Sequence, residues 1–69
     1  MSEALTRADV SRRVDDIARL TDDDEGAHAA EDALNRDVLR AIAEGAEGPA
    51  GLAAEALKSL ELSFNRWCA

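Results

Sequence analysis

The chain has 69 residues, of which fifteen are acidic and eight are basic, so its formal net charge at pH 7 is −7. This length allows one domain at most, and so small a domain buries only about 60% of the surface that its unfolded chain exposes. The acidic balance argues against binding to nucleic-acid phosphates or to anionic membranes, since both need clustered lysine and arginine.

The first predicted helix covers about residues 7–20. Thr6 is placed to cap it, and Asp9 three residues later completes a T-x-x-D variant of the capping box. Leu5 and Val10 have the spacing of a hydrophobic staple. The apolar stripe expected on this helix consists of Val10, Val14, Ile17 and Leu20.

An acidic run, Thr21 to Glu25, follows this helix. It lacks the alternating ligands, central glycine and distant glutamate of an EF-hand loop, so calcium binding is disfavoured. Carboxylates stabilise the positive end of a helix, which makes the run the start of a second helix. Asp22 has capping-box spacing to Glu25, and Asp23 or Thr21 could act as the cap instead.

The second predicted helix is the longest, from about residue 24 to 44, and Gly45 is placed to end it as a C′ glycine. Its expected buried stripe is small at the start and bulky toward the end: Ala27, Ala30, Leu34, Val38, Ala41 and Ile42.

The third predicted helix covers about residues 49–60, because Pro49 suits the first position of a helix. Its expected apolar positions are Leu52, Ala53, Ala56, Leu57 and Leu60. In the tail, residues 61–69, the chain either extends or bends before Ser63, which could cap one last turn. The prediction is an all-α fold over residues 1–69: a small three-helix domain with its C-terminal tail packed back on the core.

The tail holds the two aromatic residues of the chain, Phe64 and Trp67. A terminus frays unless something ties it down, so Trp67 is expected to dock on the body of the protein or on a partner. Leu62, Phe64 and Trp67 are the predicted interface anchors, and Arg66 is expected to pair with Glu31 or Asp32. Cys68, the lone cysteine, is interpreted as a small hydrophobe beside Trp67 rather than as a nucleophile.

One face of the second helix carries a polar ridge: His28, Glu31, Asp32 and Asn35. A His followed one turn later by a carboxylate can bind a transition metal, but such a site needs three or four protein ligands. A hydrogen bond between His28 and a carboxylate at the helix surface is the favoured interpretation. The weak metal candidates are His28, Glu31 and Asp32, and two copies of the ridge could complete a site across a dimer. No cofactor and no catalytic residue is predicted.

The chain resembles a known group of proteins in three segments: A-H-A-A-E-D-A-L-N-R-D-V-L-R-A-I-A at residues 27–43, L-A-A-E-A-L-K, and the ending F-N-R-W-C-A. It resembles short, acidic helical proteins encoded by actinobacteria and their phages, a group without an established function. The resemblance covers roughly residues 27–69, and it associates His28, Glu31, Asp32, Arg66 and Trp67 with the pattern. It implies a cytoplasmic, phage-borne accessory protein and brings no activity with it.

We therefore expect an interaction module without catalytic activity, which acts through an acidic helical surface and an aromatic C-terminal anchor. Its expected partner is another protein or its own copy, with a homodimer favoured over a monomer, and no nucleic acid or membrane. The chain has no apolar run of about 18 residues that could span a membrane, and a single cysteine suits a reducing compartment. A cytoplasmic location is expected. The alternatives are the metal-binding protein and an acidic mimic of nucleic acid that occupies a basic cleft.

Overall fold

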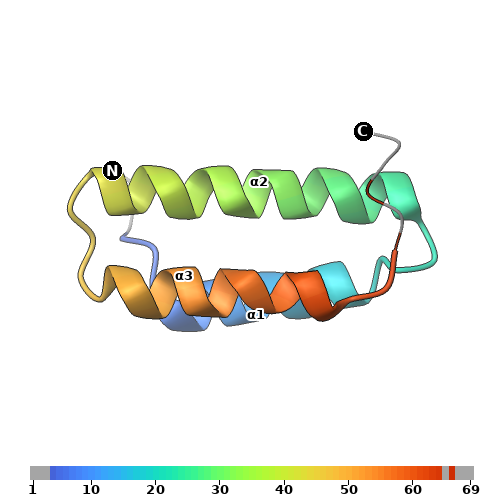
Figure 1. Cartoon of the computed structure of the whole chain (residues 1–69), viewed down its shortest axis with the longest axis horizontal. Helices are drawn as coiled ribbons and strands as arrows, with labels where there is room; N and C mark the ends of the chain where they lie inside the picture. The colour runs from blue at the N-terminus through green and yellow to red at the C-terminus, as the bar shows by residue number, and fades with distance from the viewer. Residues whose placement is uncertain (1–3, 65, 67–69) are drawn as a thin grey trace.

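The computed structural model describes residues 4–64 and 66. They form three α-helices, α1 (Arg7–Ala18), α2 (Asp24–Ala43) and α3 (Pro49–Leu57), and a 3-10 helix, η1 (Lys58–Glu61). Helix α2 runs along one side, and α1 and α3 pack against it and against each other (Figure 1). The described residues contain no strand. The predicted all-α, three-helix fold is therefore confirmed.

Helix α1 begins as predicted but ends early. The Thr6 N–H donates to Asp9 Oδ2 at 3.0 Å, and the Asp9 N–H donates to Thr6 Oγ1 at 3.1 Å, which completes the capping box. The helix ends at Ala18 rather than at Leu20. The N–H groups of Leu20 and Asp23 each bond to the carbonyl three residues back, so the chain turns here. The prediction that Leu20 belongs to the buried stripe is wrong, since Leu20 is 36% exposed.

Both ends of helix α2 are closed by local hydrogen bonds. Of the three candidate caps, Asp23 is the one that accepts the Gly26 N–H, at 3.1 Å. At the other end, the Gly45 N–H bonds to the Ile42 carbonyl and the Ala46 N–H to the Ala41 carbonyl, the pair of bonds that defines a Schellman motif. Gly45 has a φ of 88°, so the predicted C′ glycine is confirmed.

Helix α3 begins at Pro49, as predicted, after Gly48 in a left-handed conformation. It ends at Leu57, and residues up to Glu61 continue as the tighter η1. The buried side of this segment consists of Leu52, Glu55, Ala56 and Ser59. Leu57 and Leu60, which we expected in the core, are 61% and 59% exposed. Helical spacing makes the apolar side of α3 wider than the surface that α1 and α2 cover, so these two leucines lie beyond the contact.

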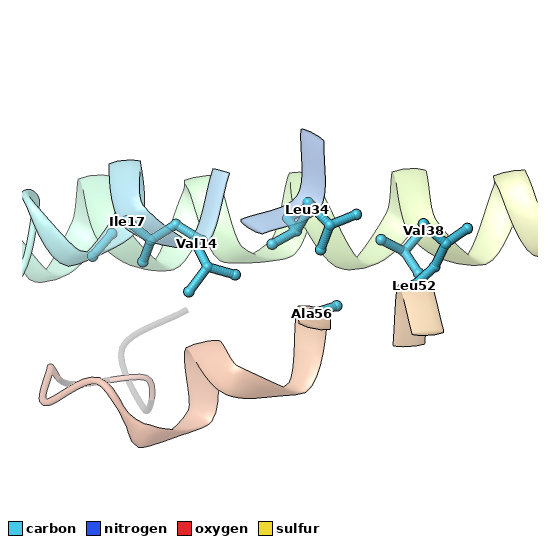
Figure 2. Packing of buried hydrophobic residues seen from close by; sticks show 8 residues of the cluster. Val14, Ile17, Leu34, Val38, Leu52 and Ala56 are labelled. Carbon is cyan, nitrogen blue, oxygen red and sulfur yellow. The ribbon is translucent and has the colours of Figure 1, made fainter. Parts of the chain in front are cut away.

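The core is small. It consists of Val10, Val14 and Ile17 from α1, Ala27, Leu34 and Val38 from α2, and Leu52 and Ala56 from α3. Figure 2 shows Leu52 beside Val38 and Ala56 beside Leu34, where α3 meets α2. Leu62 and Phe64 are partly buried against this cluster, so the described part of the tail packs back on the core as predicted. Trp67 and Cys68 lie outside the described residues.

Of the eight leucines in the sequence, Leu34 and Leu52 are the two that reach the core, and three others are more than half exposed. Among the described residues, no helix combines the length and apolarity that crossing a membrane requires.

Candidate functional site

The predicted polar ridge of α2 does not lie on one surface. Glu31 is buried, with 5% of its surface exposed, whereas Asp32 and Asn35 are exposed and His28 is half-buried. The reason is helical spacing, because Glu31 lies four residues after Ala27 and three before Leu34, both of which are in the core. This spacing was present in the sequence, but the charge of Glu31 led us to expect a surface position.

Glu31 connects α2 to Ser59 of η1 and to Arg66 of the tail. It accepts a hydrogen bond from Ser59 Oγ at 2.7 Å, and its two oxygens accept from Arg66 Nε at 2.8 Å and Arg66 Nη2 at 3.1 Å. Of the two partners predicted for Arg66, Glu31 is thus the one it contacts. Burial by itself would raise the pKa of Glu31, but hydrogen bonds from Arg66 and Ser59 and the charges of Arg66 and His28 outweigh it and lower the pKa.

Arg66 also donates hydrogen bonds to backbone carbonyls of the segment that precedes it. Its Nη2 donates to the carbonyls of Ser59 at 2.8 Å and Leu62 at 3.2 Å, and its Nη1 donates to the Phe64 carbonyl at 3.4 Å. The guanidinium lies 3.9 Å from the centre of the Phe64 ring, in a cation–π contact. Two of the predicted interface anchors, Leu62 and Phe64, and the predicted interaction residue Arg66 are therefore engaged within their own chain. Their proposed contact with a partner stays a prediction.

A second buried carboxylate, Glu55, ties α3 to the start of α1. It accepts from Arg7 Nε at 3.0 Å and from Lys58 Nζ at 2.9 Å. Hydrogen bonds from Lys58 and then Arg7 lower the pKa of Glu55. Glu55 lies three residues after Leu52, so spacing again explains its burial. In the described part of the chain, no buried side-chain nitrogen or oxygen lacks a hydrogen-bond partner. Glu31, Glu55 and Ser59 therefore have structural partners already.

The metal hypothesis gains no support from this arrangement. His28 Nδ1 lies 3.5 Å from Asp32 Oδ2, which agrees with the favoured His–carboxylate contact. Both oxygens of Glu31 are occupied by Arg66 and Ser59. Within residues 4–64 and 66, no group of three or more His, Cys, Asp or Glu side chains could hold a metal ion.

One surface hollow, of about 1020 Å³, lies between the N-terminal segment and the C-terminal end of α2. Its charged lining consists of Arg7, Arg13, Arg40, Asp37, Glu44 and Glu47, so positive and negative groups balance. Arg13 pairs with Asp37 at 2.8 Å, and Arg7 pairs with Glu55. This hollow therefore offers no excess charge to a ligand.

The second hollow, of about 350 Å³, is apolar and lies between α2 and α3. Leu39 of α2, Leu57 of α3 and Leu60 of η1 border it and are 67%, 61% and 59% exposed. Ile42 and Ala53 lie between them and are half-buried. We call these five residues the leucine face. This face was not predicted from the sequence, since Leu57 and Leu60 were expected in the core and Leu39 was not assigned a role.

Comparison with protein-family models, with curated proteins and with solved structures finds no match to this chain.

Proposed function

We propose that this chain is a protein-interaction module without catalytic activity and that it binds its partner through the leucine face. The observation that carries this proposal is the exposure of Leu39, Leu57 and Leu60 around one apolar hollow. Scattered exposed leucines are common on soluble proteins, but a contiguous apolar patch marks a binding surface. Full burial of a leucine contributes about 1.5–3 kcal/mol, so three leucines at these exposures offer about 3–6 kcal/mol to a partner.

The proposal reassigns the anchors that the sequence suggested. Leu62, Phe64 and Arg66 serve the chain's own core and its Glu31 contact, which leaves the leucine face, among the described residues, as an apolar surface available to another protein. Trp67 lies outside the described residues and stays a predicted anchor. The acidic surface that gives the chain its charge of −7 keeps the free module soluble.

The proposal includes the cellular location of the protein and its biological source. A single cysteine and the resemblance to acidic proteins of actinobacteria and their phages support a cytoplasmic accessory protein, carried by a phage or its host. The buried carboxylates have structural partners, which supports a binding role over a catalytic one.

The test is a comparison of three tagged chains as bait: wild type, Leu57→Glu and Leu20→Glu. Leu20→Glu is the matched control, because it is the same substitution at a leucine that is exposed outside the leucine face. We expect wild type and Leu20→Glu to recover the same protein in stoichiometric amount, whether another protein or an untagged copy, and Leu57→Glu to lose it. Circular dichroism confirms that each bait is folded. If folded Leu57→Glu recovers the same proteins as wild type, the proposed binding surface is wrong.

A further inference from the structure

We infer that the partner of the leucine face is a second copy of this chain, so that the α2–α3 sides of two molecules pack against each other in a two-fold dimer. This inference rests on the proposed function and names its partner. The distribution of leucines, the available area, the charge around the face and the symmetry of the contact support it.

The chain divides its leucines between the core and one exposed face. Two leucines are buried in the core, and three are 59–67% exposed on one face. The remaining core consists of one isoleucine, which is as large as leucine, and of three valines and two alanines, which are smaller. Domains of this size commonly need a second subunit, a metal or disulfides for stability. Pairing two leucine faces would bury six leucines and more than double the number of leucines that each molecule buries.

The α2–α3 side of the molecule has enough area for a dimer interface. The molecule measures 33 by 20 by 17 Å, and the side that carries α2 and α3 spans the two longer dimensions (Figure 1). The product of these lengths is about 660 Å² per copy, so two facing copies cover about 1,300 Å² at full overlap. A specific interface needs roughly 1,000 Å² in total. About three quarters of this side must therefore be used, which a second copy of equal dimensions can do.

The charge close to the leucine face is small. Two molecules of charge −7 repel each other unless their contact surfaces carry little of that charge. The charged residues at helical spacing of three, four or seven positions from the exposed leucines are Asp32, Arg36 and Glu61, with a sum of −1. The acidic excess is spread along the chain and is not concentrated at this face, since α1 and the turn after it, residues 7–23, carry five acidic and four basic side chains. Salt screens charges over about 8 Å at physiological ionic strength, so this repulsion is weak in the cell.

Two leucine faces can pack against each other about a two-fold axis. In a two-fold contact the same patch serves on both molecules, and both copies bring an equal number of leucines to an equally shaped hollow. Helical hairpins that pair in this way form a four-helix arrangement whose core is made of the two inner faces. The hollow between α2 and α3 is then filled by side chains from the other copy.

The experiment is sedimentation equilibrium of the untagged full chain from about 5 to about 500 µM, where mass action shifts a weak dimer from monomer to dimer. A reducing agent is present so that Cys68 cannot cross-link two chains. Each series is run at about 0.05 M and about 0.5 M NaCl. The variants are Leu57→Glu on α3, Leu39→Glu on α2 and the control Leu20→Glu.

We expect the mass to rise with concentration from 7.4 kDa toward twice that value. Leu57→Glu and Leu39→Glu each weaken the dimer at least tenfold while their helical circular dichroism stays that of the wild type, and Leu20→Glu leaves the dimer unchanged. Higher salt tightens the dimer, because it screens the repulsion between two acidic molecules.

Two results would overturn the inference. A mass of 7.4 kDa at every concentration and both salt levels excludes the dimer, and a dimer unaffected by both face variants places the contact elsewhere. If the wild-type chain is monomeric and binds another, identified protein that Leu57→Glu does not bind, the inference of a second copy is wrong and the proposed function stands. A monomer whose bound proteins are the same in wild type and Leu57→Glu contradicts both proposals.

Discussion

The contact between Glu31 and Arg66 should be a main determinant of stability, and Glu31→Gln is the change that tests it. The substitution keeps the shape of the side chain but removes its charge. Breaking a buried ion pair costs about 3–5 kcal/mol when both groups are fully buried. The Glu31 side chain is 6% exposed, but that of Arg66 is 30% exposed, so water recovers part of the loss. The glutamine oxygen also retains one acceptor for Ser59 or Arg66.

From this geometry we expect Glu31→Gln to lower the free energy of unfolding by about 2 kcal/mol. For a domain of 60–100 residues, 1 kcal/mol shifts Tm by about 4–8 °C, so the expected decrease is about 8–16 °C. Thermal unfolding followed by circular dichroism measures it. The matched control is Asp32→Asn, the same chemical change one residue later, at a side chain that is 64% exposed. Surface changes of this kind stay within about 0.5 kcal/mol.

A double-mutant cycle with Arg66→Met then separates the pair from its surroundings. Glu31→Gln should cost less when Arg66 is already methionine, because no buried partner charge is left behind. The reasoning is refuted if Glu31→Gln and Asp32→Asn have equal effects, or if the two substitutions at positions 31 and 66 are additive. Either outcome would mean that the contact does not hold the tail in solution.

Three further predictions follow from the local structure. The pKa of Glu31 is lowered by folding, so its contribution to stability is present above about pH 4.5, the ordinary value, and is lost as the pH falls through its lower folded value. Urea unfolding at neutral and acidic pH should show the gap between wild type and Glu31→Gln closing below pH 4.5, and a constant gap would contradict the assignment. Gly45→Ala should cost about 1 kcal/mol because φ is 88° there, whereas Gly51→Ala inside α3, with Arg7 Cδ the nearest atom at 3.8 Å, should raise stability by about 0.5–1 kcal/mol. The reverse order in thermal unfolding would refute this. Thr6→Ala removes the cap of α1 and should cost about 1 kcal/mol, and unchanged chemical unfolding would show that the cap contributes nothing.

Local signals in the sequence were sufficient to place the helices. The Thr6–Asp9 capping box, Gly45 as C′ residue and Pro49 as first helical residue all occupy the predicted positions. Such signals act between residues three to five positions apart, so they work regardless of what the rest of the chain does. The end of α1 was misplaced by two residues because Leu20 continued the apolar spacing although the chain turned away.

The tertiary structure decided which apolar and polar residues are inside. On α3, the sequence pattern gave a broad apolar side, but α1 and α2 cover one part of it, which buries Leu52 and leaves Leu57 and Leu60 exposed. Helical spacing turns two glutamates toward the core, and they stay charged there because cations from distant parts of the chain, Arg66 and Arg7, lie within hydrogen-bond distance.

The sequence alone therefore determined the fold class and the helix starts, because capping, turn chemistry and periodicity are encoded in neighbouring residues. The leucine face and the Glu31–Ser59–Arg66 contact depended on how three helices share a small core. Burial is a property of the assembled molecule, since it is set by which neighbours cover a residue, and residues far apart in the sequence supply those neighbours.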